Sequence, residues 1–316
     1  MDTGLAASAA ELNHRRWAGA FQLAEAMAPA MPPTDAAREQ TVLSMAMLCL
    51  VWDDILEDPQ LTDLQAITAL KRGLVATLRQ DPQKPWRPGA LPTAWASMWP
   101  RLREGRSASW QKRFLDGLEE WFEACEREMH HRITGYIPST ADYLPLRRAT
   151  SGFDVALAAL EMYHDIELPP KLSSHPVIRR LEELAFFVAF VENDPVGFDQ
   201  DEADQVPYNL VRAVRHETGC TRDEAIEQVR RQLAERRAQL DAVIRYIPAL
   251  LRILPGLSGQ GKKYAAIFET TTNMALSVPQ SDRHTQTSGS EGPEPDLERL
   301  RREIYHPAAD PAHAAP

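Results

Sequence analysis

The chain has 316 residues, 44% of them hydrophobic, and its 45 acidic and 35 basic side chains leave a formal net charge of −10. That length suffices for a large core in one or two domains, and the negative balance argues against nucleic-acid binding, which requires clustered Lys and Arg. No stretch is apolar for long enough to span a membrane, no signal-peptide pattern opens the chain, and the three cysteines form no disulfide or CxxC pattern, so we expect a protein of the reducing cytoplasm.

Almost every long segment has a helical period and none alternates as a strand would, which predicts an all-α fold. The first predicted helix, Ala37–Leu56, is apolar on nearly all sides, as a central helix should be. The further predicted helices are Thr62–Arg79, Ala94–Arg103, Ser107–Arg132, Ser139–His164, Val177–Asn193, Ala203–Glu217, Thr221–Tyr246 and Lys262–Val278. The composition favours one domain over residues 1–285 and a disordered tail over 286–316, which is rich in Ser, Pro, Ala and charge.

The first predicted helix ends in an acidic cluster. Asp53 and Glu57 are four residues apart and therefore project from one helix face, and Asp54 lies between them. Carboxylates at this spacing repel one another, and the negative end of the helix dipole adds to the repulsion. This indicates either a compensating Mg²⁺, which prefers oxygen ligands, or a solvated helix end, and the cluster alone does not decide between them.

A second apolar helix also runs into oxygen-rich residues. Asn193, Gly197 and Asp201 follow each other at steps of four, so they share one helix face. Two apolar helices that both end in oxygen ligands are much less expected by chance than either alone. We therefore predict that both ends face one cavity.

These motifs resemble those of the class I terpene synthases of the microbial single-domain type. Asp53-Asp54-Ile55-Leu56-Glu57 matches the family motif DDxx(D/E), and residues 193–201 resemble the motif NDxxSxxxE. Arg147 in the context Tyr143-x-x-x-Arg147 matches the family's diphosphate-sensing arginine, and its separation from Asn193 (193 − 147 = 46) is typical of the family. The resemblance covers residues 17–283 and implies a single-domain helical bundle around a central apolar cavity.

The resemblance also implies roles for individual residues. Three Mg²⁺ ions would bind at Asp53, Asp54, Glu57, Asn193, Gly197 and Asp201. Gly197 replaces the family's Ser, and Asp201 replaces its Glu, so Glu202 remains an alternative ligand. The catalytic candidates are Arg147, the helix break at Ser151 and Gly152, and Arg283 as a further contact to diphosphate.

A carbocation needs walls that do not attack it, and aromatic faces stabilise positive charge. The candidate pocket residues lie before the two metal motifs and after Gly152. They are Met45, Cys49, Phe153, Phe186, Phe187 and Phe190.

The function implied by the resemblance is that of a Mg²⁺-dependent terpene cyclase that ionises a linear prenyl diphosphate and cyclises the carbocation. Farnesyl (C15) and geranylgeranyl (C20) diphosphate both remain open as substrates, with the small Ala46 and Cys49 leaning weakly towards C20. The alternatives are a chain-elongating prenyltransferase, which would normally show two DDxxD motifs, and a non-catalytic helical scaffold or degenerate relative. Homodimers are common among such relatives, but no residue here demonstrates one.

Overall fold

The structure, a computed structural model, describes residues 35–57, 64–79, 90–169, 175–203, 205–253 and 261–277. All regular secondary structure in these ranges is helical, which confirms the predicted all-α class. The helices are α3 (Ala36–Glu57), α4 (Leu64–Arg79), α5 (Ala90–Leu102), α6 (Ala108–Thr134), α7 (Thr140–Thr150), α8 (Phe153–Tyr163), α10 (Pro176–Val191), α11 (Asn193–Ala203), α12 (Leu210–Thr218), α13 (Arg222–Ile253) and α14 (Gly261–Ser277). None of the helices in the described ranges is long and apolar enough to cross a membrane.

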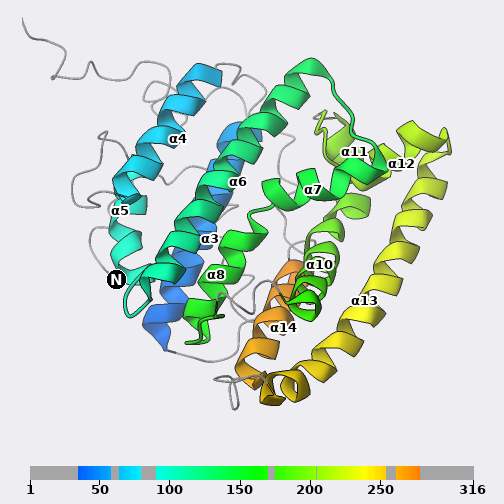
Figure 1. Cartoon of the computed structure of the whole chain (residues 1–316). Coiled ribbons are helices and arrows are strands. Elements are labelled where there is room, and N and C mark those ends of the chain that lie inside the picture. The colour runs from blue at the N-terminus through cyan, green and yellow to red at the C-terminus, as the bar shows by residue number, and fades with distance from the viewer. Residues whose placement is uncertain are drawn as a thin grey trace, which may run out of the picture.

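The long helix α6 crosses the middle of the bundle, with α4 and α5 on one side and α13 at the opposite edge (Figure 1). Helix α3 packs against α5, α6 and α8, and α10 packs against α13 and α14. A large apolar core joins these helices, and tryptophans such as Trp52, Trp95 and Trp99 are completely buried in it. A second apolar cluster lies between α7, α10, α11, α12 and α13.

Local signals set the ends of α6 as predicted. The Ser107 side chain accepts a hydrogen bond from the Trp110 amide and so caps the N-terminus. Gly135 ends the helix with φ of +69°, in the left-handed region that glycine reaches without steric cost. The next helix, α7, is capped in the same way by Ser139, which accepts from the Asp142 amide.

Two predicted helices differ from the structure. The segment from Ser139 to His164 is not one helix, because the chain breaks at Ser151 and Gly152 between α7 and α8. In the segment predicted from Ala203 to Glu217, Ala203 is the last residue of α11, and α12 begins at Leu210, where Asn209 caps it. Periodicity alone does not show these breaks, because Phe153 and Tyr208 beside them are buried like core residues.

Candidate active site

Helix α3 and the pair α10–α11 carry the two acidic motifs towards the same end of the bundle, the upper end in Figure 1. The charges of both motifs influence the ionisation of Glu128, which lies on α6. Burial is the main cause that raises the pKa of Glu128 to about 7; Arg147 lowers it, and the charges of Asp53 and Asp201 raise it further. Since Coulomb interactions weaken with distance, the two motifs share one electrostatic environment around Glu128.

Glu128 was missed by the sequence analysis, although a signal for it exists. It follows Trp121 and Cys125 at helical spacing on α6, and both of those side chains are buried. A carboxylate on the buried stripe of an amphipathic helix is unusual, because an ionised group there loses its hydration. The thiol of Cys125 lies in the same environment, where burial and the charges of Asp53 and Glu128 raise its pKa.

Arg147, in the last turn of α7, supplies positive charge to this acidic region. Its Nε atom lies 3.9 Å from Oδ1 of Asp194. The same Nε is buried and has no hydrogen-bond partner among the described residues. Burial lowers the pKa of Arg147, but the neighbouring Asp194, Tyr143, Glu128 and Asp201 together raise it above its ordinary value. The residue is therefore a half-buried cation whose Nε–H has no partner among the described residues, which suits it to binding an anion.

The adjacent Arg148 has a different environment. It donates to Asp154 at 2.6 Å, lies 3.7 Å from Glu182, and stacks over the ring of Phe153 at 4.8 Å. These contacts tie α7 to α8 and α10. The structure thus separates two neighbouring arginines: Arg147 lies near Asp194 and Asp201 of the second motif, whereas Arg148 pairs with Asp154 and Glu182.

Asp194 is a buried carboxylate that organises α11 and does not face solvent. It accepts hydrogen bonds from the Tyr143 hydroxyl and, at 2.6 Å, from the Leu210 amide. Burial raises the pKa of Asp194 to about 7, even though Arg147 and these hydrogen bonds lower it. Its side chain is only 1% exposed, so its donors come from α7 and α12, not from water.

Gly197 and Asp201 lie one turn apart on α11, as predicted. A Cβ atom built on Gly197 would lie 3.7 Å from Oδ1 of Asp201, an ordinary contact distance. Oδ2 of Asp201 accepts a hydrogen bond of 2.8 Å from Asn209. Glu202 instead forms an exposed ion pair of 2.6 Å with Arg215. Between the two alternative ligands, this placement favours Asp201.

The helix break after Arg147 lies where the resemblance implies it. The Ser151 amide donates to the Arg147 carbonyl at 3.0 Å and ends α7. Gly152 has φ of +66°, and a Cβ atom there would lie 3.4 Å from the ring of Trp121. The backbone angle therefore favours glycine, and an added Cβ atom would touch the tryptophan ring. The catalytic role of Ser151 and Gly152 remains a prediction.

Three of the predicted wall residues form one aromatic cluster. The Phe153 ring lies edge-on to Phe186 and Phe190 at 5.8 and 5.9 Å, and Phe186 stacks with Phe190 at 5.9 Å. Met45 and Cys49 line the face of α3 that ends in Asp53. The Cys49 thiol is deeply buried and its pKa is raised by burial and by Asp53, yet the residue keeps partial solvent access.

Phe187 does not join this cluster. It lies on another side of α10, in the second apolar cluster with Tyr143, Phe198 and Val211. Arg236 of α13 lies 5.1 Å above its ring. The neighbouring Phe186 points about 100° away from it on the helix, and the role of Phe187 as a pocket residue remains a prediction.

The donors around Asp53, Asn193 and Asp201 are all oxygen atoms, which matches the ligand preference of Mg²⁺. Within the described ranges, no three His, Cys, Asp or Glu side chains converge on one point as a preformed metal cluster. The side chains of Asp54 and Glu57 lie outside the described part of the structure, and so does Arg283. Burial is the main cause of the raised pKa values of Glu128 and Asp194, and the further rise from Asp53 and Asp201 reflects the acidic side chains that gather here.

Comparisons with known proteins bear on what this arrangement does. The family model described as "Terpene synthase family 2, C-terminal metal binding" matches residues 44–239. The chain is 26% identical over 226 residues to 7-epi-alpha-eudesmol synthase of Streptomyces viridochromogenes, covering 71% of this chain and 65% of the relative. It is 28% identical over 197 residues to epi-isozizaene synthase of Streptomyces coelicolor, covering 62% and 55%. These matches thus span less than two thirds of each curated relative.

Solved structures show the same fold. Germacradien-4-ol synthase from Streptomyces citricolor superposes with a TM-score of 0.74 at 19% identity, covering 88% of this chain and 89% of that one. Linalool/nerolidol synthase from Streptomyces clavuligerus, solved with 2-fluorogeranyl diphosphate, gives a TM-score of 0.73 at 18% identity, covering 81% and 87%. Since the family model also matches more than half of the sequence, the chain belongs to the terpene synthase family.

Proposed function

We propose that this protein is a Mg²⁺-dependent terpene cyclase that ionises farnesyl diphosphate and cyclises the resulting carbocation. The observation that carries the proposal is the shared environment of Asp53 and Asp201. Asp53 and Asp201, almost 150 positions apart in sequence, both act on one carboxyl, Glu128, and Asp201 also acts on Arg147.

The candidate ligands Asp53, Asn193 and Asp201 would hold Mg²⁺, together with Asp54 and Glu57 of the first motif. When bound, Mg²⁺ would supply Lewis-acid stabilisation of the negative charge that develops on the departing diphosphate. Asp194 does not take part directly, because its carboxylate is occupied by Tyr143 and by the Leu210 amide.

Arg147 acts on the diphosphate itself. Its planar guanidinium can donate two parallel hydrogen bonds to phosphate oxygens, and it lies at the turn that ends in Ser151 and Gly152. Because it remains charged, it stabilises the leaving group as the carbon–oxygen bond breaks.

The hydrocarbon part of the substrate would lie against Phe153, Phe186 and Phe190. Their ring faces stabilise a carbocation by about 0.5–2 kcal/mol each. Apolar side chains offer no nucleophile, so the cation cyclises before water can capture it. Loss of a proton or addition of water would complete the reaction.

The relatives support a C15 substrate over the C20 substrate that the small residues Ala46 and Cys49 favoured weakly. The name of the relative from Streptomyces viridochromogenes specifies (2E,6E)-farnesyl diphosphate. Two relatives from Postia placenta are named sesquiterpene synthases.

Incubation with geranyl, farnesyl and geranylgeranyl diphosphate, with and without Mg²⁺, tests the proposal by gas chromatography and mass spectrometry. We expect a cyclic C15 hydrocarbon or alcohol from farnesyl diphosphate, and no product in the presence of a chelator. Product only after addition of isopentenyl diphosphate would indicate a prenyltransferase. No product from any of these substrates would favour a non-catalytic relative.

A further inference from the structure

Asn209 links the candidate metal ligand on α11 to the start of α12. The residue lies in the loop between these helices and is completely buried, with 0% exposure. Its side-chain oxygen accepts hydrogen bonds from the Val211 amide at 2.9 Å and from the Arg212 amide at 3.3 Å. Asn209 is therefore the N-cap of α12.

The amide nitrogen of Asn209 points the other way, to α11. It donates to Oδ2 of Asp201 at 2.8 Å and to the backbone carbonyl of Asp194 at 2.9 Å. A carboxamide has two N–H donors, and both are thus used. The Asn209 carboxamide cannot be flipped by 180°, because its NH₂ group would then face the amide N–H groups of Val211 and Arg212.

The surrounding contacts hold this arrangement in place. The Val206 amide donates to the backbone carbonyl of Asp201 at 2.8 Å, and Arg212 donates to the Val206 carbonyl at 2.7 Å. The Leu210 amide donates to the Asp194 side chain. Helix α11 has only 11 residues, so these bonds at its two ends determine where Asp201 is placed.

We propose that Asn209 is a positioning residue that orients the Asp201 carboxylate for the cation. An aspartate on an exposed helix turn samples several rotamers and must lose that freedom when it binds a metal. The bond from Asn209 restricts the carboxylate beforehand, on the side of α11 where Gly197 leaves room. This inference rests on the proposed function, because it assumes that Asp201 is a ligand.

The substitution Asn209→Asp tests the inference with little change of shape. Aspartate caps helices as well as asparagine does, but it cannot donate a hydrogen bond to Asp201. We expect the folded variant to bind Mn²⁺ about 10- to 100-fold more weakly in the presence of inorganic diphosphate, the usual consequence of losing a contact that orients a metal ligand. Electron paramagnetic resonance of free Mn²⁺ measures this directly, without any need for turnover.

Two further variants separate positioning from stability. Ser139→Ala removes the N-cap of α7 and should lower the unfolding temperature while leaving Mn²⁺ affinity unchanged. Asn209→Ser keeps a capping oxygen, but its side chain is too short to reach Asp201. If Asn209→Asp does not fold, Asn209→Ser takes its place in the test, and the same loss of Mn²⁺ affinity is expected.

The outcomes distinguish this inference from the function on which it rests. If the wild type binds no Mn²⁺ with diphosphate, the proposed function fails and the inference fails with it. If the wild type binds and the folded Asn209 variants bind equally well, the inference alone is wrong. Weaker binding in the Asn209 variants but not in Ser139→Ala supports it.

Discussion

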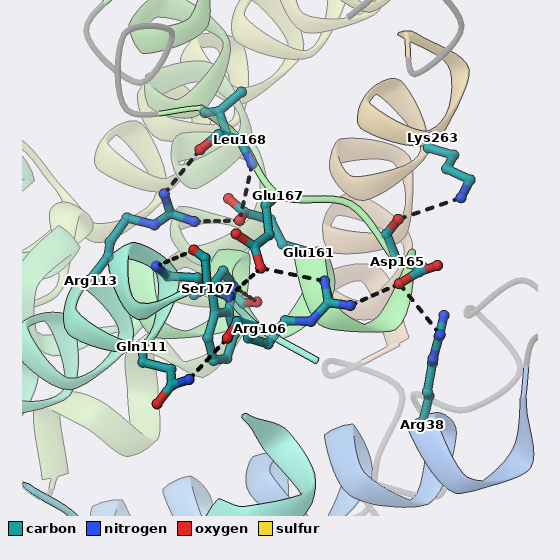
Figure 2. Close-up of polar contacts among 12 residues, drawn as sticks. Arg38, Arg106, Ser107, Gln111, Arg113, Glu161, Asp165, Glu167, Leu168 and Lys263 are labelled. Atoms are coloured by element: carbon teal, nitrogen blue, oxygen red, sulfur yellow. Dashed lines mark hydrogen bonds and ion pairs between the residues drawn. The ribbon is translucent and has the colours of Figure 1, made fainter. Parts of the chain in front are cut away.

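The two ends of the bundle differ in the surroundings of their aspartates. At the end opposite the candidate site, Asp165 interacts with Arg106 at 2.8 Å and with Arg38 at 3.4 Å, and Lys263 donates to its carbonyl (Figure 2). Hydrogen bonding to Arg106 lowers the pKa of Asp165. At the candidate site, burial raises the pKa of Asp194 to about 7. Ion pairing dominates at Asp165, whereas at Asp194 burial outweighs the neighbours that favour its anion.

The network in Figure 2 connects segments that are distant in sequence. Arg113 on α6 donates to Glu161 on α8 and to the Leu168 carbonyl, and the Ser107 amide donates to Glu167 at 2.8 Å. In each of these pairs, both the donor and the acceptor belong to the protein. At the other end, the charge of Arg147 acts on both Glu128 and Asp194. The difference lies in the arrangement of the charges: one end distributes its ion pairs over Arg38, Arg106 and Arg113, whereas the other gathers acidic side chains around Arg147.

The largest expected effect is on the candidate ligands. Asp201→Ala should lower turnover of farnesyl diphosphate on the order of a thousandfold, equivalent to about 4 kcal/mol, because metal stabilisation of the leaving group contributes several kcal/mol. Glu202→Ala is the matched control, since Glu202 is paired with Arg215 and should retain nearly full activity. Steady-state kinetics checks both variants, and the reverse order of effects would assign the ligand to Glu202.

The second effect separates the two neighbouring arginines. Arg147→Lys should reduce kcat/KM about 100-fold or more, because lysine cannot form the bidentate contact to phosphate. Arg148→Lys should change kcat/KM little, since its partners Asp154 and Glu182 lie outside the acidic region of the site. Kinetics at matched Mg²⁺ concentration provides the measurement, and equal losses in both variants would remove the distinction that the structure draws.

A third effect concerns stability at the helix break. Gly152→Ala should destabilise the fold by about 1–2 kcal/mol from the backbone angle, with a further loss from contact with Trp121. Gly105→Ala is the control, since Gly105 has a similar φ of +68° but nothing within 4 Å of the added Cβ atom. Denaturant unfolding of both variants isolates the contribution of Trp121, and equal losses would mean that the ring moves aside freely.

The smallest effect is a pH dependence within the network of Figure 2. Asp165 has a lowered pKa, so its stabilisation is present above pH 3.8 and is lost as the pH falls below that value. Burial raises the pKa of Glu161 to about 7 from 4.5 despite Arg113, so the wild type loses stability as the pH rises from 4.5 to 7.

Thermal unfolding across pH tests both signs. The unfolding temperature of Asp165→Asn should lie below that of the wild type, and this difference should shrink only below pH 3.8. The unfolding temperature of Glu161→Gln should rise relative to that of the wild type as the pH increases from 4.5 to 7. The same pH dependence of the unfolding temperature in both variants would contradict opposite pKa shifts at Asp165 and Glu161.

Much of the fold follows from local sequence signals. Ser107, Gly135 and Ser139 each lie at a helix end where their chemistry predicts it. Helical periodicity could not show the break at Gly152, because Phe153 and the residues after it continue the buried pattern. It also extended a helix back to Ala203, since the cap at Asn209 follows a loop whose residues Pro207 and Tyr208 are buried like core residues.

The site was predicted in part. The two motifs and Arg147 follow from spacing and resemblance, and the structure brings Asp53, Asp201 and Arg147 into one environment. Glu128 comes from a helix with no motif, so only its place on a buried stripe could have revealed it. Phe187 is predicted as a wall residue because it lies with Phe186 and Phe190 on the helix before Asn193, but it packs in the second apolar cluster.

The central claim is that Asp53 and Asp201 bind one cation and diphosphate assembly together. Thermal unfolding with Mg²⁺ and inorganic diphosphate tests it most directly, because a ligand that binds only the folded state raises the unfolding temperature. The account predicts a clear rise for the wild type and for Glu202→Ala, and none for Asp53→Ala or Asp201→Ala. A full rise in either of the last two variants would contradict it.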